Sequence, residues 1–141
     1  MDRFLAETDC DPQSYSPLTL AFIGDGVFEL FVRERLVLQG NCPVKELHKH
    51  AVKQVQAAAQ AMVVPKLEPI LSEEEISVLK RGRNAHVGHV PKNASVADYH
   101  AATALESLFG YLYLKGDLKR LQELFLEVCK IQMQDIEKTN L

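Results

Sequence analysis

The sequence predicts an all-α fold, and three observations support the prediction. Apolar residues recur at spacings of three and four along most of the 141 residues, which is the period of an amphipathic helix. No window alternates strictly between apolar and polar residues, so no strand is expected. Proline and glycine separate the helical segments. The length suits one helical domain over residues 1–141.

The first helix is expected to begin near Pro17 and to end at Gly40. Ser16 is a suitable N-cap, and Pro17 suits the first helical position because its missing N–H would have no partner there. The helix is apolar nearly all round, which is typical of a helix inside a bundle or at an interface.

A second helix is expected after Asn41 and Pro43, running through the alanine-rich stretch to a stop at Pro65. A shorter helix should follow, with Ser72 as its cap and glutamates in its first turn. It ends with basic residues, as the helix dipole favours.

The segment "NAHVGHVPKN", residues 84–93, is expected to be a loop. Ser95 and Asp98 form a start resembling a capping box for a long apolar helix, from about Val96 to Lys115, closed at Gly116. A last amphipathic helix should cover Leu118 to roughly Glu137.

Charge is distributed unevenly along the chain. The net charge of −3 argues against a generally basic nucleic-acid binder. Residues 76–97, however, carry four basic side chains and no Asp or Glu, so the remainder must carry −7. We call these four residues the basic segment: Lys80, Arg81, Arg83 and Lys92.

The N-terminal residues and the lack of long apolar stretches predict a cytoplasmic protein. The N-terminus has no apolar signal region, and no stretch approaches the roughly 18 apolar residues of a membrane span. We therefore expect no membrane association. Cys10, Cys42 and Cys129 are far apart and include no C-x-x-C pair, so they are expected to be reduced.

Acidic residues interrupt two apolar helices. Asp25 and Glu29 lie on an apolar stripe of the first helix, and Glu106 is the one acidic residue of residues 99–114, which contain no Lys or Arg. Ionised carboxylates in an apolar setting cost several kcal/mol each unless they are paired or bind a metal.

Glycines suggest where the two helices meet. Gly24, Gly26 and Gly110 each lower helix propensity, and such glycines commonly mark close backbone approach. If the helices cross there, the three carboxylates could converge on a divalent ion, for which oxygen ligands favour Mg²⁺ or Mn²⁺. From spacing alone, pairing with an arginine, helix capping or a wet dimer interface explains buried acids equally well.

Several motifs resemble the ribonuclease III family. The stretches "LAFIGDGVF" and "TALESLFGYLYLKGD" are similar to its "LEFLGDAVL" and "DxFEALIGALYLD" signatures. The stretches "LAFIGDGVFELFVRERL", "RGRNA", "PKNAS" and "DYHAATALESLFGYLYL" are closer still to its Mini-ribonuclease III branch, which lacks a double-stranded-RNA-binding domain. The resemblance spans roughly Pro17 to Asp117 and implies the ribonuclease III endonuclease-domain helical bundle.

The resemblance assigns roles to individual acids. Asp25 and Glu106 match the family's metal-binding catalytic acids. Ala21 and Thr103 stand where long enzymes of the family have a glutamate and an aspartate, as is expected of the short branch. Glu29, favoured in that branch, is a further candidate metal ligand. Asp98 is a weak catalytic candidate, because its position in the first turn suits capping.

The resemblance also implies the activity. It implies a Mg²⁺-dependent endonuclease, with Mn²⁺ as a substitute, that cuts double-stranded RNA to leave 5′-phosphate and 3′-hydroxyl ends. Members of the family are homodimers, so the resemblance implies a homodimer here. Apolar surface for its interface would come from Phe22, Phe28 and Phe31. Its role is to mature large-subunit (23S) ribosomal RNA precursors, in bacteria rather than in plastids.

The basic segment is the candidate RNA-binding surface, with His86 and His89 beside it, because A-form RNA is recognised mostly through phosphates and the minor groove. A second basic ridge recurs at helical spacing and is equally well explained as an exposed helix face: Lys45, Lys49 and Lys53. The two histidines lack third and fourth ligands, so zinc is not expected.

Two other functions remain open. Ala21 and Thr103 are compatible with a non-catalytic RNA-binding or ribosome-associated protein on the same fold. An all-α metal-dependent nucleotide pyrophosphohydrolase would also collect acids from facing helices. The endonuclease would cut duplex RNA, and the pyrophosphohydrolase would hydrolyse nucleoside triphosphates and ignore duplex RNA. The non-catalytic protein would bind RNA without cutting it.

Overall fold

The computed structural model describes residues 3–5, 8–85, 88–92 and 95–139. Its described residues form helices and no strands, which confirms the all-α prediction. The helices, in chain order, are the short 3₁₀ helix η1 (Pro12–Ser14), α1 (Pro17–Leu38), α2 (Val44–Val55), α3 (Ala57–Leu67), the 3₁₀ helix η2 (Glu68–Ile70), α4 (Glu73–Arg83), α5 (Val96–Lys115) and α6 (Leu118–Thr139).

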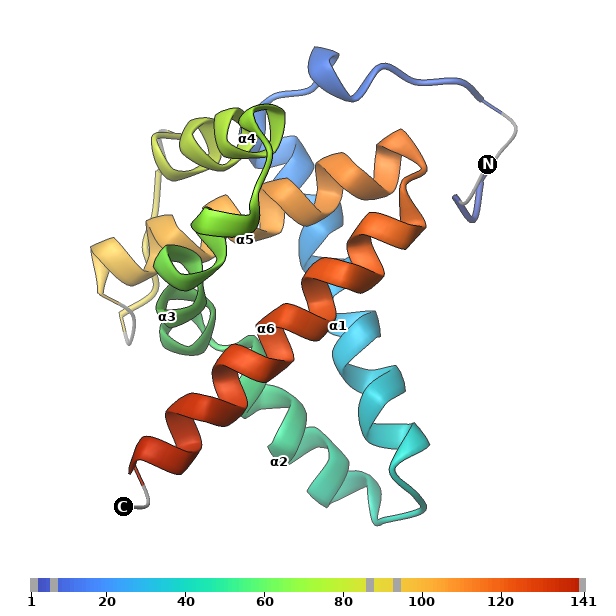
Figure 1. Ribbon diagram of the computed structural model, residues 1–141, viewed down its shortest axis with the longest axis vertical. Helices are drawn as coiled ribbons and strands as arrows, with labels where there is room; N and C mark the ends of the chain where they lie inside the picture. Colours follow the sequence, from blue (N-terminus) through green and yellow to red (C-terminus); the bar gives the residue numbers. More distant parts are fainter. Residues whose placement is uncertain (1–2, 6–7, 86–87, 93–94, 140–141) are drawn as a thin grey trace.

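Helix α5 is the centre of the bundle. It packs against α1, α3, α4 and α6, while α6 passes diagonally between α3 and α1 in the view of Figure 1. Nearly every residue of α5 from 102 to 112 is buried. An aromatic cluster joins three of the helices, since the ring of Phe28 on α1 lies edge-on to Phe109 on α5, at 5.2 Å, and to Phe125 on α6, at 5.8 Å. Burial in one core therefore explains the apolar character of α5 and of one face of α1.

The predicted helix ends are mostly correct. Ser16 Oγ accepts a hydrogen bond from the Thr19 N–H, and Ser95 Oγ accepts one from the Asp98 N–H. Ser72 and Glu75 form a complete capping box at the start of α4. Gly116 closes α5 in the left-handed conformation, with φ of 82°.

The predicted second helix is wrong in two respects. It is two helices, because Gln56 adopts an extended conformation with φ −65° and ψ 152°, which lets α2 pack on α1 while α3 packs on α5. Pro65 does not end the helix but lies inside α3. It forfeits one backbone hydrogen bond, and complete burial of Val64 and Leu67 on either side offsets that loss.

A half-buried ion pair joins α4 to α6. Arg120 donates from Nε to Glu75 Oε2 and from Nη2 to Glu75 Oε1, both at 2.8 Å. Burial alone would raise the pKa of Glu75, but the hydrogen bonds from Arg120 and the Ser72 N–H leave it below its ordinary value.

The three cysteines are free thiols, of which Cys42 is exposed and Cys129 is buried. Among the described residues, no helix combines the length and the apolar character that crossing a membrane would need.

Candidate active site

The backbones of α1 and α5 touch at two glycines. A Cβ atom added to Gly24 would lie 1.7 Å from the backbone oxygen of Glu106, and one added to Gly110 would lie 1.9 Å from that of Leu20. The predicted crossing is confirmed for these two glycines. It is wrong for Gly26, where a Cβ would meet no described atom within 4 Å.

The crossing brings together the carboxylates of Asp25 and Glu106. Asp25 is exposed, whereas Glu106 is mostly buried. Burial raises the pKa of Glu106 to about 9, and a hydrogen bond with Asp25 and the charge of Asp25 raise it in the same direction. Without a cation, Glu106 therefore keeps its proton at neutral pH.

This pair of oxygen donors fits a divalent cation. Neither acid forms a salt bridge with a described Lys, Arg or His, so no side-chain cation compensates their charges. Two adjacent carboxylates that are short of positive charge are a suitable donor set for Mg²⁺ or Mn²⁺. Asp25 and Glu106 are thus the two residues of the pair that could hold the ion.

The third acidic candidate, Glu29, is paired with an arginine instead of with the other two acids. Glu29, one helical turn beyond Asp25, forms a salt bridge with Arg33, with 3.2 Å between Oε1 and Nη2. In the part of the chain that the structure describes, no three His, Cys, Asp or Glu side chains are grouped as metal ligands usually are. The structure therefore brings together Asp25 and Glu106 without a third such ligand, and a role of Glu29 in metal binding stays a prediction.

The two positions without acids lie in the interior. Ala21 is buried, and so is Thr103, whose hydroxyl donates a hydrogen bond to the Tyr99 carbonyl at 2.9 Å. Both hold small side chains beside the crossing, and the Thr103 hydroxyl is already engaged within α5.

A pocket of about 400 Å³ opens beside Glu106. It is formed by the junction of α2 with α3 and by the first turns of α5, and Asp98 lines it, although Asp98 also lies in the capped first turn of α5. Its polar lining consists of Gln56, Gln60, Asp98, Tyr99, Thr103 and Glu106.

Sequence reasoning missed Gln60. This residue of α3 is only 2% exposed, and its amide approaches Glu106 closely enough to lower the pKa of that acid. The signal in the sequence was a lone glutamine among Ala, Met and Val in "AAAQAMVV".

All four residues of the basic segment are exposed. Lys80 and Arg81 are exposed on α4 and border a hollow of about 630 Å³ beside Pro17. Arg83 forms a salt bridge with Glu68 at 3.3 Å. Lys92 is exposed in the loop between α4 and α5.

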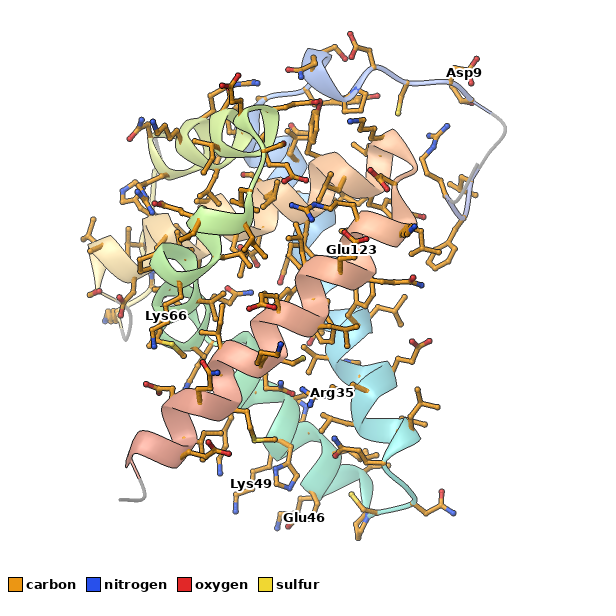
Figure 2. All side chains as sticks on the ribbon, viewed as in Figure 1. Asp9, Arg35, Glu46, Lys49, Lys66 and Glu123 are labelled. Atoms are coloured by element: carbon orange, nitrogen blue, oxygen red, sulfur yellow. The ribbon has the colours of Figure 1, made fainter. Side chains whose placement is uncertain are left out.

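The remaining basic and histidine candidates that the structure describes lie outside the core. His89 is exposed, whereas His86 lies outside the described residues. The second basic ridge lies on α2 and consists of Lys45, Lys49 and Lys53. Figure 2 shows Lys49 pointing away from the body of the molecule.

The pKa of Glu106 predicts how the stability of the metal-free protein depends on pH. A carboxyl whose pKa rises from 4.5 to about 9 on folding contributes stability that is complete below its unfolded pKa and is lost as pH rises through its folded pKa. Between pH 5 and pH 9 the wild type should therefore lose up to about 5 kcal/mol of unfolding free energy that Glu106→Gln retains.

Urea unfolding in the presence of a chelator measures this difference. Glu34→Gln, which alters an exposed acid of α1, should follow the wild-type profile. An equally steep loss of stability in Glu106→Gln would show that Glu106 titrates as an ordinary carboxyl.

Comparison with known proteins places this fold and site in a class. Residues 18–117 match the family described as the Ribonuclease III domain. A crystal structure of a protein from Fusobacterium nucleatum superposes with a TM-score of 0.76 and 32% sequence identity, over 87% of this chain and 98% of that one.

Similarity to named relatives shows to which branch of this family the chain belongs. The chain is 50% identical to a Mini-ribonuclease 3 of Symbiobacterium thermophilum, over 80% of this chain and 87% of that protein. It is 46% identical to a Mini-ribonuclease 3 of Thermoanaerobacter, over 89% and 85%. The chain therefore belongs to the ribonuclease III family, in its Mini-ribonuclease III branch.

Proposed function

We propose that the chain is a Mg²⁺-dependent endoribonuclease that cleaves double-stranded RNA and leaves 5′-phosphate and 3′-hydroxyl ends. The observation that carries the proposal is the meeting of Asp25 and Glu106 at the crossing of α1 and α5, with no described side-chain cation paired to either. Membership of the ribonuclease III family supports it.

Each acid has a distinct part in this proposal. Asp25 and Glu106 would hold the ion, and Mg²⁺ bound there would supply Lewis-acid chemistry for phosphodiester hydrolysis. Asp25 is exposed and would be accessible to the RNA, whereas Glu106, whose pKa is raised, would have to give up its proton to hold the ion. No side-chain nucleophile is required.

The basic segment would bind the duplex. Lys80, Arg81 and Lys92 are exposed and can contact phosphates, while Arg83 already shares its charge with Glu68. Binding through phosphates weakens steeply as salt is added. In this proposal residues 1–141 form one catalytic domain, and these residues supply its contacts to the phosphates of the duplex.

A homodimer would place two such sites on one duplex, each cutting one strand. The observation that supports it is Phe22, which is 84% exposed on α1, accompanied on the same helix by the exposed side chains of Leu18 and Leu30. Phe28 does not contribute to this surface, because it is only 1% exposed in the core. The cellular substrate in this proposal is the precursor of 23S ribosomal RNA in the bacterial cytoplasm.

A cleavage assay on long, labelled duplex RNA tests the function. We expect cutting only when Mg²⁺ or Mn²⁺ is present, with ends that carry 5′-phosphate and 3′-hydroxyl. Duplex RNA that is bound but never cut would favour the non-catalytic RNA-binding alternative. Hydrolysis of nucleoside triphosphates, with duplex RNA left intact, would favour the pyrophosphohydrolase.

A further inference from the structure

Gln60 carries an unusual buried amide. Its side chain is 2% exposed on α3, and its Nε2 has no hydrogen-bond partner among the described residues. Gln60 lines the same pocket as Glu106, and the interaction of its amide with that carboxylate lowers the pKa of Glu106, although Nε2 meets no acceptor at full hydrogen-bond geometry. Leaving a buried donor of this kind without a partner is unfavourable, because its bond to water is lost and not replaced.

Another buried glutamine shows that this cost is avoidable in the same bundle. Gln132 on α6 is 7% exposed, yet its Oε1 accepts a hydrogen bond from Gln54 Nε2 at 3.2 Å. Its Nε2 donates to the Gln54 carbonyl at 3.3 Å. The unpaired Nε2 is thus particular to Gln60, which lies beside the candidate metal site.

A neutral amide donor is well suited to a position beside a carboxylate that binds a metal ion. An ionised carboxylate accepts hydrogen bonds at both oxygens, so a donor fixed by α3 can hold one oxygen of Glu106 while the other remains free. A lysine or arginine at residue 60 would also donate, but its charge would compete with a divalent cation for the two acids. A neutral amide orients the ligand without that competition, as outer hydrogen-bond partners do in metal sites.

We propose that Gln60 is a positioning residue whose Nε2 donates a hydrogen bond to the ionised Glu106 carboxylate and turns its second oxygen toward Asp25 and the cation. The proposal rests on the proposed function, since it assumes that Asp25 and Glu106 bind the ion. It assigns the pocket wall formed by α3 to the metal site, in addition to α1 and α5.

Gln60→Met in the full chain tests the proposal, because methionine keeps the length of the side chain and removes the donor. The Mg²⁺ concentration at half-maximal thermal stabilisation, measured without RNA, should rise about tenfold. At a fixed, subsaturating Mg²⁺ concentration kcat should fall by a similar factor, while KM for duplex RNA stays unchanged. Gln132→Met, the matched control, should alter the melting temperature and leave the Mg²⁺ midpoint at its wild-type value.

A measurement on the wild type removes any dependence on how the variant folds. The side-chain ¹⁵N–¹H₂ resonances of Gln60 should shift when Mg²⁺ is added, whereas those of Gln132 should not. Resonances of Gln60 that stay in place, or a wild-type Mg²⁺ midpoint in Gln60→Met, would overturn the proposal. A wild type that does not respond to Mg²⁺ at all would instead overturn the proposed function.

Discussion

Asp25→Asn should lower the rate of duplex RNA cleavage by about a thousandfold, because it removes one of the two anionic ligands from the site. The variant should fold, since Asp25 is exposed and its amide replacement has nearly the same shape. RNA binding through the basic segment should persist. Cleavage rates with labelled duplex RNA, together with a filter-binding measurement, separate the two effects.

Glu34→Gln is the matched control for this prediction. Glu34 is an exposed acid of the same helix, away from the crossing, so its neutral variant should cleave as the wild type does. Wild-type cleavage by Asp25→Asn would refute the assignment of Asp25 as a catalytic acid.

Gly24→Ala should destabilise the fold by about 3 kcal/mol or more, because its Cβ would overlap the backbone oxygen of Glu106. The obstacle is main chain, so no rotamer change can relieve it, and α1 and α5 must move apart. Chemical denaturation measures the loss.

Gly26→Ala provides a control with the opposite sign. A Cβ at Gly26 meets no described atom within 4 Å, and alanine is a better helix former than glycine by about 1 kcal/mol. This variant should therefore be as stable as the wild type or more so. Equal stability of Gly24→Ala and the wild type would contradict the close backbone contact at the crossing.

Local chemistry made much of the fold predictable. The hydroxyls of Ser16, Ser72 and Ser95 cap the helices they precede, and Gly116 ends the helix it follows. Each of these features depends on residues within one turn of the helix end, so the sequence is sufficient to identify them.

Features that depend on distant partners were not predictable in the same way. The extended conformation of Gln56 follows from packing α2 and α3 on different helices. The pairing of Glu75 with Arg120 joins residues on α4 and α6 that have no shared sequence pattern. Gly24 and Gly26 look alike in the sequence, and their orientation toward or away from α5 distinguishes them.

In the candidate site, too, some features were predictable from the sequence and others required the structure. The unusual positions of Asp25 and Glu106 in apolar helices were visible in the sequence, and the resemblance to a family gave them roles. The approach of Gln60 to Glu106 depends on the turn between α2 and α3, which the sequence did not predict. Contacts across helices therefore required the structure.

Calorimetric titration of Mg²⁺ into the RNA-free protein tests the shared metal site most directly. At neutral pH the wild type should bind the ion and release about one proton, seen as a dependence of the enthalpy on the buffer, because Glu106 is protonated beforehand. Asp25→Asn and Glu106→Gln should each lose this binding. Unchanged Mg²⁺ affinity in both variants would contradict the account.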